Sequence, residues 1–371
     1  MKYMLIAGEA SGDLHASHLI TALSKDDPKA EFVIIGGDLM GAAAGVQPRL
    51  HISRMNFMGF AQVIANMPAV VANLKLAKQL LHDERPDKLI LVDYPSFNLR
   101  VAKEAHALGI PVYYYISPKL WAWKAWRIKS IKRLVAKVLC ILPFEPKWYA
   151  ERGYSEAVYV GNPSVGEIDA AIASAPSRED FLRANRLRDH RIIALLPGSR
   201  KGEIKGNLPI MDAVARQFPQ YTIVVAGAPA IPDDFYKGLT KFTVIRDQTH
   251  WLLAHTHAAL VTSGTATLEA ALAGVPQVAL YRSNGSKMAY KIMEKILHVK
   301  FVTLPNLICD SPVIPEMLMH HCNVEEVTAE LRRLTPACSE ARELMLKGYA
   351  RMRGILTNAD APTNAAHEIR Q

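Results

Sequence analysis

A chain of 371 residues is too long for one ordinary hydrophobic core, so two domains are expected. Half of the residues are hydrophobic and 21% are charged, which is enough apolar material for two buried parallel sheets. The net charge of +9 invites anionic partners, while four scattered cysteines without a CxxC pair argue against a zinc site or a disulfide framework and indicate a reducing compartment. No run reaches the roughly 18 apolar residues of a spanning helix, so any membrane contact is expected to be peripheral.

The first half of the chain alternates predicted strands with predicted helices. Residues 1–13 combine a short apolar run with a Gly-acidic loop and no cleavage-type tail, so we expect a first strand rather than a signal peptide. Apolar runs predict strands at residues 3–7, 32–36, 88–92, 112–116 and 138–142. Helices are predicted at 15–23 and across 70–81, where one face carries Val70, Leu74, Ala77 and Leu81. Asp93 follows a strand, and ligands collect at the carboxyl ends of parallel strands, so it is well placed for chemistry.

An apolar loop, MNFMGF at residues 55–60, is not explained by this helix face. Its large side chains are Met55, Phe57, Met58 and Phe60. These side chains either pack in the hydrophobic core or form an exposed hydrophobic surface, and the sequence leaves both interpretations open.

Basic and tryptophan side chains are interleaved in the middle of the chain, where no acidic residue occurs between Glu104 and Glu145. The set consists of Lys119, Trp121, Trp123, Lys124, Trp126, Arg127, Lys129, Lys132, Arg133 and Lys137. Such a mixture suits a nucleic acid or a membrane interface. For residues 129–137 a solvated basic helix is an equally good interpretation, and no nucleic-acid-binding motif accompanies the stretch.

The second half repeats the architecture of the first without a visible sequence repeat. The turn Gly161-Asn162-Pro163 interrupts the alternation of strands and helices, so we place the domain boundary there. This gives domains at 1–162 and 163–342 and a helix and tail at 343–371. Strands are predicted at residues 192–196, 222–227, 243–246, 258–261 and 277–281, with a helix-rich polar segment at 177–190.

Residues 258–276, AALVTSGTATLEAALAGVP, predict a phosphate cradle. A buried strand leads into a small-residue turn at 262–265 that opens a helix, whose first N–H groups lack partners and carry the positive dipole end. A carboxylate beside a pyrophosphate would be repelled, so Glu269, one turn in, is interpreted as binding a neutral diol such as a ribose, with a plain solvated Glu as the alternative. A second small turn, residues 197–200, carries Arg200 after strand 192–196.

Seven motifs occur in the order found in the lipid-A-disaccharide synthase family. They are GEASGD (8–13), SPKLWAWK (117–124), LPFE (142–145), VGNP (160–163), LLPGSR (195–200), SGTATLE (263–269) and LPN (304–306). The chain resembles that family over nearly its whole length. The resemblance implies an α/β GT-B fold of two facing Rossmann-like domains with mostly parallel sheets, a C-terminal helix that crosses back, and UDP bound in the C-terminal domain.

The resemblance also implies the reaction. A 2,3-diacylglucosamine would pass from its UDP form to 2,3-diacylglucosamine 1-phosphate, giving a β(1→6) disaccharide with inversion. The four acyl chains and the anionic acceptor imply a cytoplasmic protein attached peripherally to the inner face of the cytoplasmic membrane. Because family members can exchange the last helix, a homodimer is possible. No cofactor is implied, and no metal ion is expected because the chain has no DxD pair.

The site residues follow by matching motifs to positions in this chain. UDP is expected to contact Gly198, Ser199, Arg200, Ser263, Gly264, Thr265, Ala266, Glu269 and Asn306. The acceptor, its acyl chains or the membrane are expected to contact Met55, Phe57, Met58, Phe60, Trp121, Trp123 and Lys124. The family often has DxPDFN with a second, catalytically important carboxylate where this chain has DYPSFN with Ser96, so the candidate bases are Asp93, Asp13 and Glu9.

Other functions remain possible on the sequence. Another UDP-N-acetylglucosamine-dependent GT-B enzyme, a muramyl-pathway-like transferase or an epimerase, would share the cradle. An oxidoreductase is weakly supported because Gly8 and Gly12 do not form GxGxxG. A nucleic-acid-binding protein would leave LPGSR and SGTATLE without a role, so we expect no nucleic-acid partner.

Overall fold

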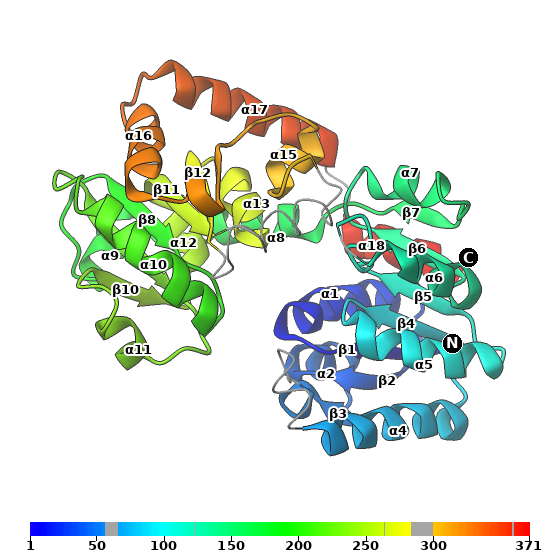
Figure 1. Cartoon of the computed structure of the whole chain (residues 1–371). Helices are drawn as coiled ribbons and strands as arrows, with labels where there is room; N and C mark the ends of the chain where they lie inside the picture. Colours follow the sequence, from blue (N-terminus) through cyan, green and yellow to red (C-terminus); the bar gives the residue numbers. More distant parts are fainter. Residues whose placement is uncertain (56–65, 123, 263, 283–299, 358–359) are drawn as a thin grey trace. The chain divides into compact units, whose positions relative to one another are not determined.

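The computed structural model describes residues 1–55, 66–122, 124–262, 264–282, 300–357 and 360–371. The chain forms two compact units, one of residues Met1–Pro163 with Asn358–Gln371 and one of residues Ser164–Thr357 (Figure 1). Each unit contains one parallel sheet with helices on its faces, which confirms the expected α/β class.

The first sheet has the strand order β3-β2-β1-β4-β5-β6-β7, and every pair in it is parallel. Its strands are β1 (Lys2–Ala7), β2 (Glu31–Gly36), β3 (Leu50–His51), β4 (Lys88–Val92), β5 (Val112–Tyr115), β6 (Lys137–Cys140) and β7 (Ala157–Tyr159). The five predicted strands are confirmed, whereas β3 and β7 are too short to show a periodicity. The strand order reverses between β1 and β4, where Ala7 pairs with Val92, so the switch point of this sheet lies beside Asp93.

Helices cover both faces of this sheet because alternate strand residues are apolar on both sides. On one face Leu5, Ile34 and Ile90 pack with α1 (Ala10–Asp26), α2 (Asp38–Ala44) and α18 (Ala361–Arg370). On the other face Met4, Ile6 and Leu91 pack with α4 (Met67–Glu84), α5 (Pro95–Ala107) and α6 (Ile128–Leu134). The remaining helical segments are η1 (Ile52–Arg54), η2 (Ala125–Arg127) and α7 (Glu145–Ala150).

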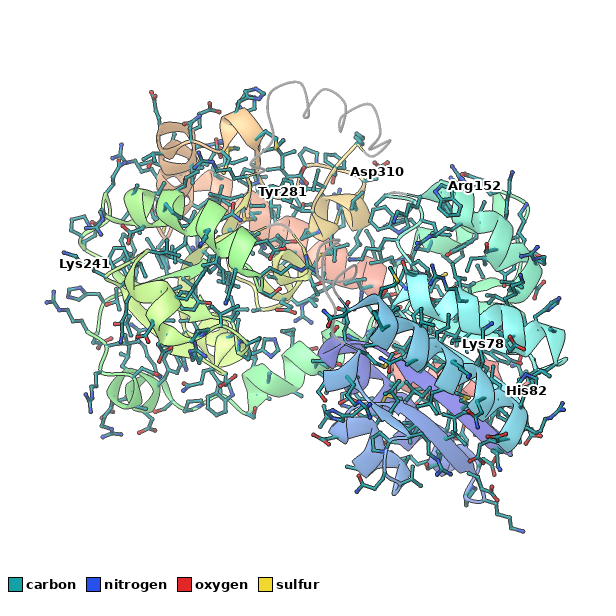
Figure 2. The ribbon with its side chains drawn as sticks, turned by 60° about the horizontal axis from the view of Figure 1, so that its bottom comes forward. Lys78, His82, Arg152, Lys241, Tyr281 and Asp310 are labelled. Carbon is teal, nitrogen blue, oxygen red and sulfur yellow. The ribbon has the colours of Figure 1, made fainter. Side chains whose placement is uncertain are left out.

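Helix α4 confirms the predicted helix, and Leu74, Ala77 and Leu81 of its predicted inward face pack on the core. Ala77, Leu80 and Leu81 are buried, whereas Leu74 is only partly buried. On the outer side Lys78 and His82 of α4 both contact Glu104 of α5, at 2.9 and 3.1 Å (Figure 2). These contacts link two neighbouring helices at the surface.

Helix α18 returns the end of the chain to the first unit, as the resemblance implies. Ala365, Ala366 and Ile369 are fully buried in the core beside α1. Glu368 pairs with Lys137 of β6 at 2.7 Å, and the amide of Asn364 donates to the carbonyl of Val160 at 3.0 Å. Within the expected 343–371 segment only this last helix belongs to the first unit, because α17 (Glu340–Leu356) belongs to the second.

The second sheet has the order β10-β9-β8-β11-β12-β13, again all parallel. Its strands are β8 (Ile192–Leu196), β9 (Thr222–Gly227), β10 (Thr243–Arg246), β11 (Thr256–Thr262), β12 (Gln277–Tyr281) and β13 (Glu316–Leu318). The five predicted strands are confirmed, and β13 is the addition. The order reverses between β8 and β11, so the turns that start at Pro197 and at Gly264 meet at one switch point.

The helices of this unit are α8 (Pro163–Ala173), α9 (Arg178–Ala184), α10 (Lys201–Ala215), α11 (Asp233–Lys237), α12 (Thr249–Ala254), α13 (Thr265–Leu272), α15 (Leu304–Cys309), η3 (Met319–His321), α16 (Val324–Leu334) and α17. Across the described ranges, no helix combines the length and the apolar character needed to cross a membrane. All four cysteines are free thiols.

Candidate active site

The segment after β1, which leads into α1, lies at the switch point of the first sheet, and packing leaves little room for a side chain at its two glycines. A Cβ on Gly8 would lie 2.4 Å from the ring of Tyr94, and one on Gly12 would lie 3.3 Å from the Cβ of Ala7. Burial, and after it the charge of Glu9, raises the pKa of the Tyr94 phenol. The candidate base Glu9 is half-buried and precedes α1 as its N-cap residue.

Asp13, another candidate base, is used as a structural cap. Its side chain is 4% exposed and accepts hydrogen bonds from the backbone N–H groups of Gly37, Leu39 and Met40 at 2.7, 3.2 and 3.2 Å. A Cβ on Gly37 would lie 2.4 Å from a carboxylate oxygen of Asp13, so the turn and the carboxylate require each other. Asp13 therefore holds the start of α2, and its lone pairs are largely occupied.

Asp93 is half-buried at the carboxyl end of β4 and directly precedes Tyr94, the N-cap residue of α5. Both residues lie in the left-handed region, with φ of 44° and 47°. Desolvation by burial raises the pKa of the Asp93 carboxyl, and the ammonium of Lys119 opposes that shift. The backbone N–H of Tyr94 also lowers the pKa of this carboxyl, whereas three backbone N–H groups bind the carboxyl of Asp13.

Ser96, at the position of the missing second carboxylate, is exposed at the start of α5. Its hydroxyl accepts a hydrogen bond from the guanidinium of Arg127 at 3.0 Å. A cation therefore stands beside the position where the related pattern has an acid.

The basic and tryptophan stretch divides into two parts. The first is a loop whose Trp121 side chain donates from Nε1 to Oε1 of Glu145 at 3.1 Å, and whose Lys124 is half-buried at φ 56°. The second is α6, where Ile131 and Leu134 are buried and Lys132 is exposed. The solvated-helix interpretation therefore fits α6.

The expectation that Met55 faces acyl chains or a membrane needs correction. Met55 is 1% exposed in the core, and its carbonyl accepts a hydrogen bond from the Tyr94 hydroxyl at 3.1 Å. Met55 therefore helps to hold the loop after β4 through its hydrogen bond with Tyr94. The other expected contacts Phe57, Met58, Phe60, Trp123 and Ser263 lie outside the described residues.

In the second unit the turn after β8 surrounds the carboxylate of Glu203. Gly198 has φ 109°, and a Cβ there would lie 2.6 Å from an oxygen of Glu203. That oxygen accepts from the backbone N–H groups of Ser199 and Arg200 at 3.2 and 3.3 Å, while the guanidinium of Arg200 pairs with the other oxygen at 2.9 Å. The turn thus already binds an anion, which is the capability that a phosphate site requires.

The turn after β11 opens α13, as the cradle pattern predicts. Gly264 has φ 143°, a conformation that favours glycine, and its carbonyl accepts from the Thr267 hydroxyl at 2.7 Å. Thr265 is exposed and Ala266 is half-buried at the start of the helix. The buried hydroxyl of Thr262 has no hydrogen-bond partner among the described residues.

Glu269 lies one turn into α13 beside His250 of α12. Their Oε2 and Nε2 atoms are 3.7 Å apart, and this interaction raises the pKa of His250. Both line a cavity of about 460 Å³, together with Ala171, Asp247, Gln248, Thr249 and Trp251. The contribution of residues 247–251 was not predicted from the sequence, although this segment follows the carboxyl end of predicted strand 243–246, where ligands are expected.

Asn306 has its hydrogen-bonding groups engaged within the fold. It is 1% exposed, donates to Glu316 and to the carbonyl of Ile314 at 2.9 Å each, and accepts from the N–H groups of Val313 and Ile314 at 2.7 and 2.9 Å. The side chain fixes the segment before β13.

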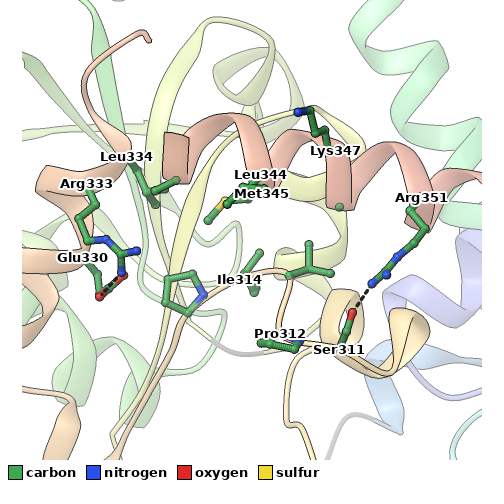
Figure 3. Close-up of a pocket in the computed structure, with 14 residues that line it drawn as sticks. Ser311, Pro312, Ile314, Glu330, Arg333, Leu334, Leu344, Met345, Lys347 and Arg351 are labelled. Atoms are coloured by element: carbon green, nitrogen blue, oxygen red, sulfur yellow. Dashed lines mark hydrogen bonds and ion pairs between the residues drawn. The ribbon is translucent and has the colours of Figure 1, made fainter. Parts of the chain in front are cut away.

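A second cavity of this unit, of about 620 Å³, lies between α16, α17 and residues 311–315 (Figure 3). Of its cations, Arg333 forms an ion pair with Glu330, and Arg351 donates a hydrogen bond to the hydroxyl of Ser311. Residues 311–315 precede β13, so the cavity lies towards the amino ends of the strands. The described residues contain no cluster of three His, Cys, Asp or Glu side chains that could hold a metal ion.

Solved structures with related folds are enzymes that handle nucleotide sugars or transfer sugars. UDP-GlcNAc 2-epimerase from Neisseria meningitidis is 13% identical with a TM-score of 0.68, and the match covers 100% of this chain and 98% of that one. The calicheamicin glycosyltransferase CalG4 is 16% identical with a TM-score of 0.61, and the match covers 100% of this chain and 97% of that one. These similarities concern the fold alone, and they confirm GT-B architecture.

Sequence comparison is more specific. The lipid-A-disaccharide synthase of Myxococcus xanthus is 39% identical over 379 aligned positions, covering 99% of this chain and 96% of the relative. The family model for lipid-A-disaccharide synthetase matches residues 3–350, which include both switch points and all seven motifs. The chain therefore belongs to the lipid-A-disaccharide synthase family.

Proposed function

We propose that this protein joins UDP-2,3-diacylglucosamine to 2,3-diacylglucosamine 1-phosphate and releases UDP and the β(1→6) disaccharide 1-phosphate. The observation that carries the proposal is membership of the family over residues 3–350. The structure supports it because both sheets have their motif-bearing loops at a switch point, which is where open α/β sheets bind ligands. The substrates are therefore a nucleotide sugar and a lipid-linked sugar.

The second unit is proposed to hold UDP. The first N–H groups of α13, at Gly264, Thr265 and Ala266, would bind the diphosphate, and Arg200 would turn to it from Glu203. Moving the Arg200 side chain away from Glu203 costs little free energy, because an ion pair whose arginine side chain is 62% exposed is worth about 0–1 kcal/mol. Gly198 and Ser199 shape the same turn.

The nucleoside is proposed to occupy the cavity beside Glu269. The carboxylate of Glu269 would accept hydrogen bonds from the ribose hydroxyls, and segment 247–251 would border the base. We assign Asn306 to supporting the segment before β13, since its polar atoms are already engaged.

The first unit is proposed to hold the acceptor and the general base. The Asp93 carboxylate would take the proton of the acceptor 6-hydroxyl as that oxygen bonds to the anomeric carbon of the donor, while the bond from that carbon to the UDP oxygen breaks with inversion. A raised pKa suits this task because it makes the carboxylate a stronger base. Glu9 is the next candidate, and Asp13 is left with its capping role.

Charge on the departing UDP would be stabilised by the α13 N-terminus and Arg200, without a metal ion or another cofactor. We further propose peripheral attachment to the inner face of the cytoplasmic membrane, mediated by the basic and tryptophan stretch before α6, including Trp126, which is 66% exposed. A homodimer is also proposed, to be tested by light scattering across a concentration series.

The decisive experiment is a mass-spectrometric assay with both acylated substrates. Formation of the tetra-acylated disaccharide phosphate and UDP is expected. If the protein instead converts UDP-N-acetylglucosamine without an acceptor, it is an epimerase and the proposal is wrong.

A further inference from the structure

We propose that Glu145 is a positioning residue for the acceptor: it holds residues 117–122, here called the tryptophan loop, through the indole N–H of Trp121. The proposal rests on the proposed function of the first unit as the acceptor side. It assigns a role to the LPFE motif, which no step of the reaction described above uses.

The geometry around Glu145 joins two neighbouring loops. Glu145 is the first residue of α7 and is 1% exposed. Its Oε1 accepts from Trp121 at 3.1 Å, and its Oε2 accepts from the backbone N–H of Leu142 at 3.1 Å. The Trp121 ring also meets the ring of Phe144 edge-on, with centroids 5.1 Å apart. One carboxyl group thus connects the loop after β5 to the turn after β6.

The tryptophan loop carries Lys119, whose charge links the anchor, meaning the contacts of Glu145 with Trp121 and Leu142, to the carboxyl of Asp93. Lys119 is exposed, and its charge lowers the pKa of both Asp93 and Glu145 against the effect of burial. Its ammonium therefore acts on both carboxyls from one loop. Any loosening of Trp121 would shift this cation relative to Asp93 and to the space beside it, where the anionic acceptor is proposed to bind.

The anchor changes near neutral pH. Burial raises the pKa of Glu145 from 4.5 to about 7, opposed by its hydrogen bonds and by Lys119. An ionised carboxylate accepts from both Trp121 and Leu142, whereas the protonated acid has an O–H that faces one of these donors, so one bond is lost. The anchor is therefore complete above pH 7 and weakened below it.

Three titratable groups of the described chain that interact with Glu145 stay neutral near pH 7. Burial, with a smaller contribution from Glu145, raises the pKa of Cys140 on β6, of Tyr149 on α7 and of Tyr159 on β7. Lys119 supplies the positive charge that faces the carboxyl from the tryptophan loop.

The test compares wild type, Glu145→Gln, Trp121→Phe and a control, Glu151→Gln, which alters an exposed carboxyl just after α7. Steady-state kinetics are measured from pH 6 to pH 8.5 with each substrate varied in turn. In wild type and the control, the acceptor KM should rise about three- to tenfold as pH falls through 7, the equivalent of one lost hydrogen bond. In Glu145→Gln and Trp121→Phe the acceptor KM should stay at the high value from pH 6 to pH 8.5, while the donor KM stays unchanged.

A second readout does not depend on turnover. The fluorescence difference between wild type and Trp121→Phe should titrate with a midpoint near pH 7, and Glu145→Gln should abolish the titration. A wild-type KM profile in Glu145→Gln, or a pH-independent difference spectrum, would overturn the proposal. An inactive wild type with an intact fluorescence titration would instead count against the proposed function alone. Should Glu145→Gln fold poorly, Trp121→Phe, which keeps the ring, provides the same comparison.

Discussion

Tyr114 donates a 2.6 Å hydrogen bond from its phenol to the backbone carbonyl of Asp93. The amide of Asn98 donates to the same carbonyl at 2.7 Å. Asp93 has φ 44°, a conformation that costs energy for a residue with a side chain, and the two donors hold it there. The backbone is thus fixed at the carboxyl edge of the sheet, where the reaction needs a base.

We predict that Asp93→Asn lowers kcat by at least about 100-fold, because general-base catalysis contributes about 10²–10⁴-fold. UDP affinity and Tm should remain nearly unchanged, since UDP is assigned to the other unit and the hydrogen bonds from Asn98 and Tyr114 go to the backbone carbonyl of Asp93. Steady-state kinetics, calorimetry and thermal melts provide the three measurements. Asp26→Asn, which removes an exposed carboxylate on α1, is the control.

The pH profile offers a further check on Asp93. A base works only when it is deprotonated, and burial raises the pKa of this carboxyl. The acid limb of kcat should therefore lie at higher pH than an ordinary aspartate would give, with turnover lost below that limb. Retained turnover together with lost stability in Asp93→Asn would show that the residue is structural and would shift attention to Glu9.

Asp13→Asn should give the opposite pattern. The amide has a single acceptor oxygen for the three N–H groups that Asp13 binds, so at least one buried donor loses its partner. We expect a loss of about 1–3 kcal/mol in the free energy of unfolding and nearly normal kcat per folded molecule. Urea unfolding and active-site-normalised kinetics measure these quantities. A 100-fold fall in kcat at full stability would restore Asp13 as the base.

Arg200→Ala is predicted to weaken UDP binding by roughly tenfold or more, because charge-assisted hydrogen bonds are worth about 1.5–3 kcal/mol. The fold should be little affected, since the ion pair with Glu203 lies at the surface. Titration calorimetry with UDP measures the change, and Arg183→Ala on α9 is the exposed control. Equal affinities for the two variants would remove Arg200 from the UDP site.

Activity should survive EDTA. The chain has no DxD pair, and the described residues contain no cluster of acidic or histidine side chains suited to a cation. The turn at Ser199 and Arg200 already stabilises an anionic carboxylate with N–H groups alone. Loss of turnover in EDTA with recovery on adding magnesium would contradict a metal-independent mechanism.

Local patterns were sufficient to predict the architecture. Strands β4, β8, β9, β10 and β12 have the bounds expected from their apolar runs. The Gly264 turn and α13 follow from small residues between a buried strand and a helix, which is also local information. Strands of two or three residues, such as β3 and β7, carry no periodicity and were missed.

The roles of individual polar residues depended on contacts distant in sequence. The sequence favours Asp93 as the base and leaves Asp13 as the next candidate, and the packing of α2 against Asp13, 24 to 27 positions away, identifies Asp13 as a cap. Met55 likewise reads as surface or core until its burial is known. The bond between Trp121 and Glu145 joins two motifs that the sequence shows separately.

Ser96→Asp tests whether a second carboxylate could take over the base's role in this chain. The Ser96 hydroxyl already accepts a hydrogen bond from Arg127 at 3.0 Å, so a carboxylate introduced there would pair with the guanidinium. A neighbouring cation favours the charged form and lowers the pKa, which makes the carboxylate a weaker base. We therefore expect Asp93→Asn combined with Ser96→Asp to remain as slow as Asp93→Asn alone. Ser96→Asn is the neutral control of similar size, and a recovery of kcat specific to the acid would show that the base can act from position 96.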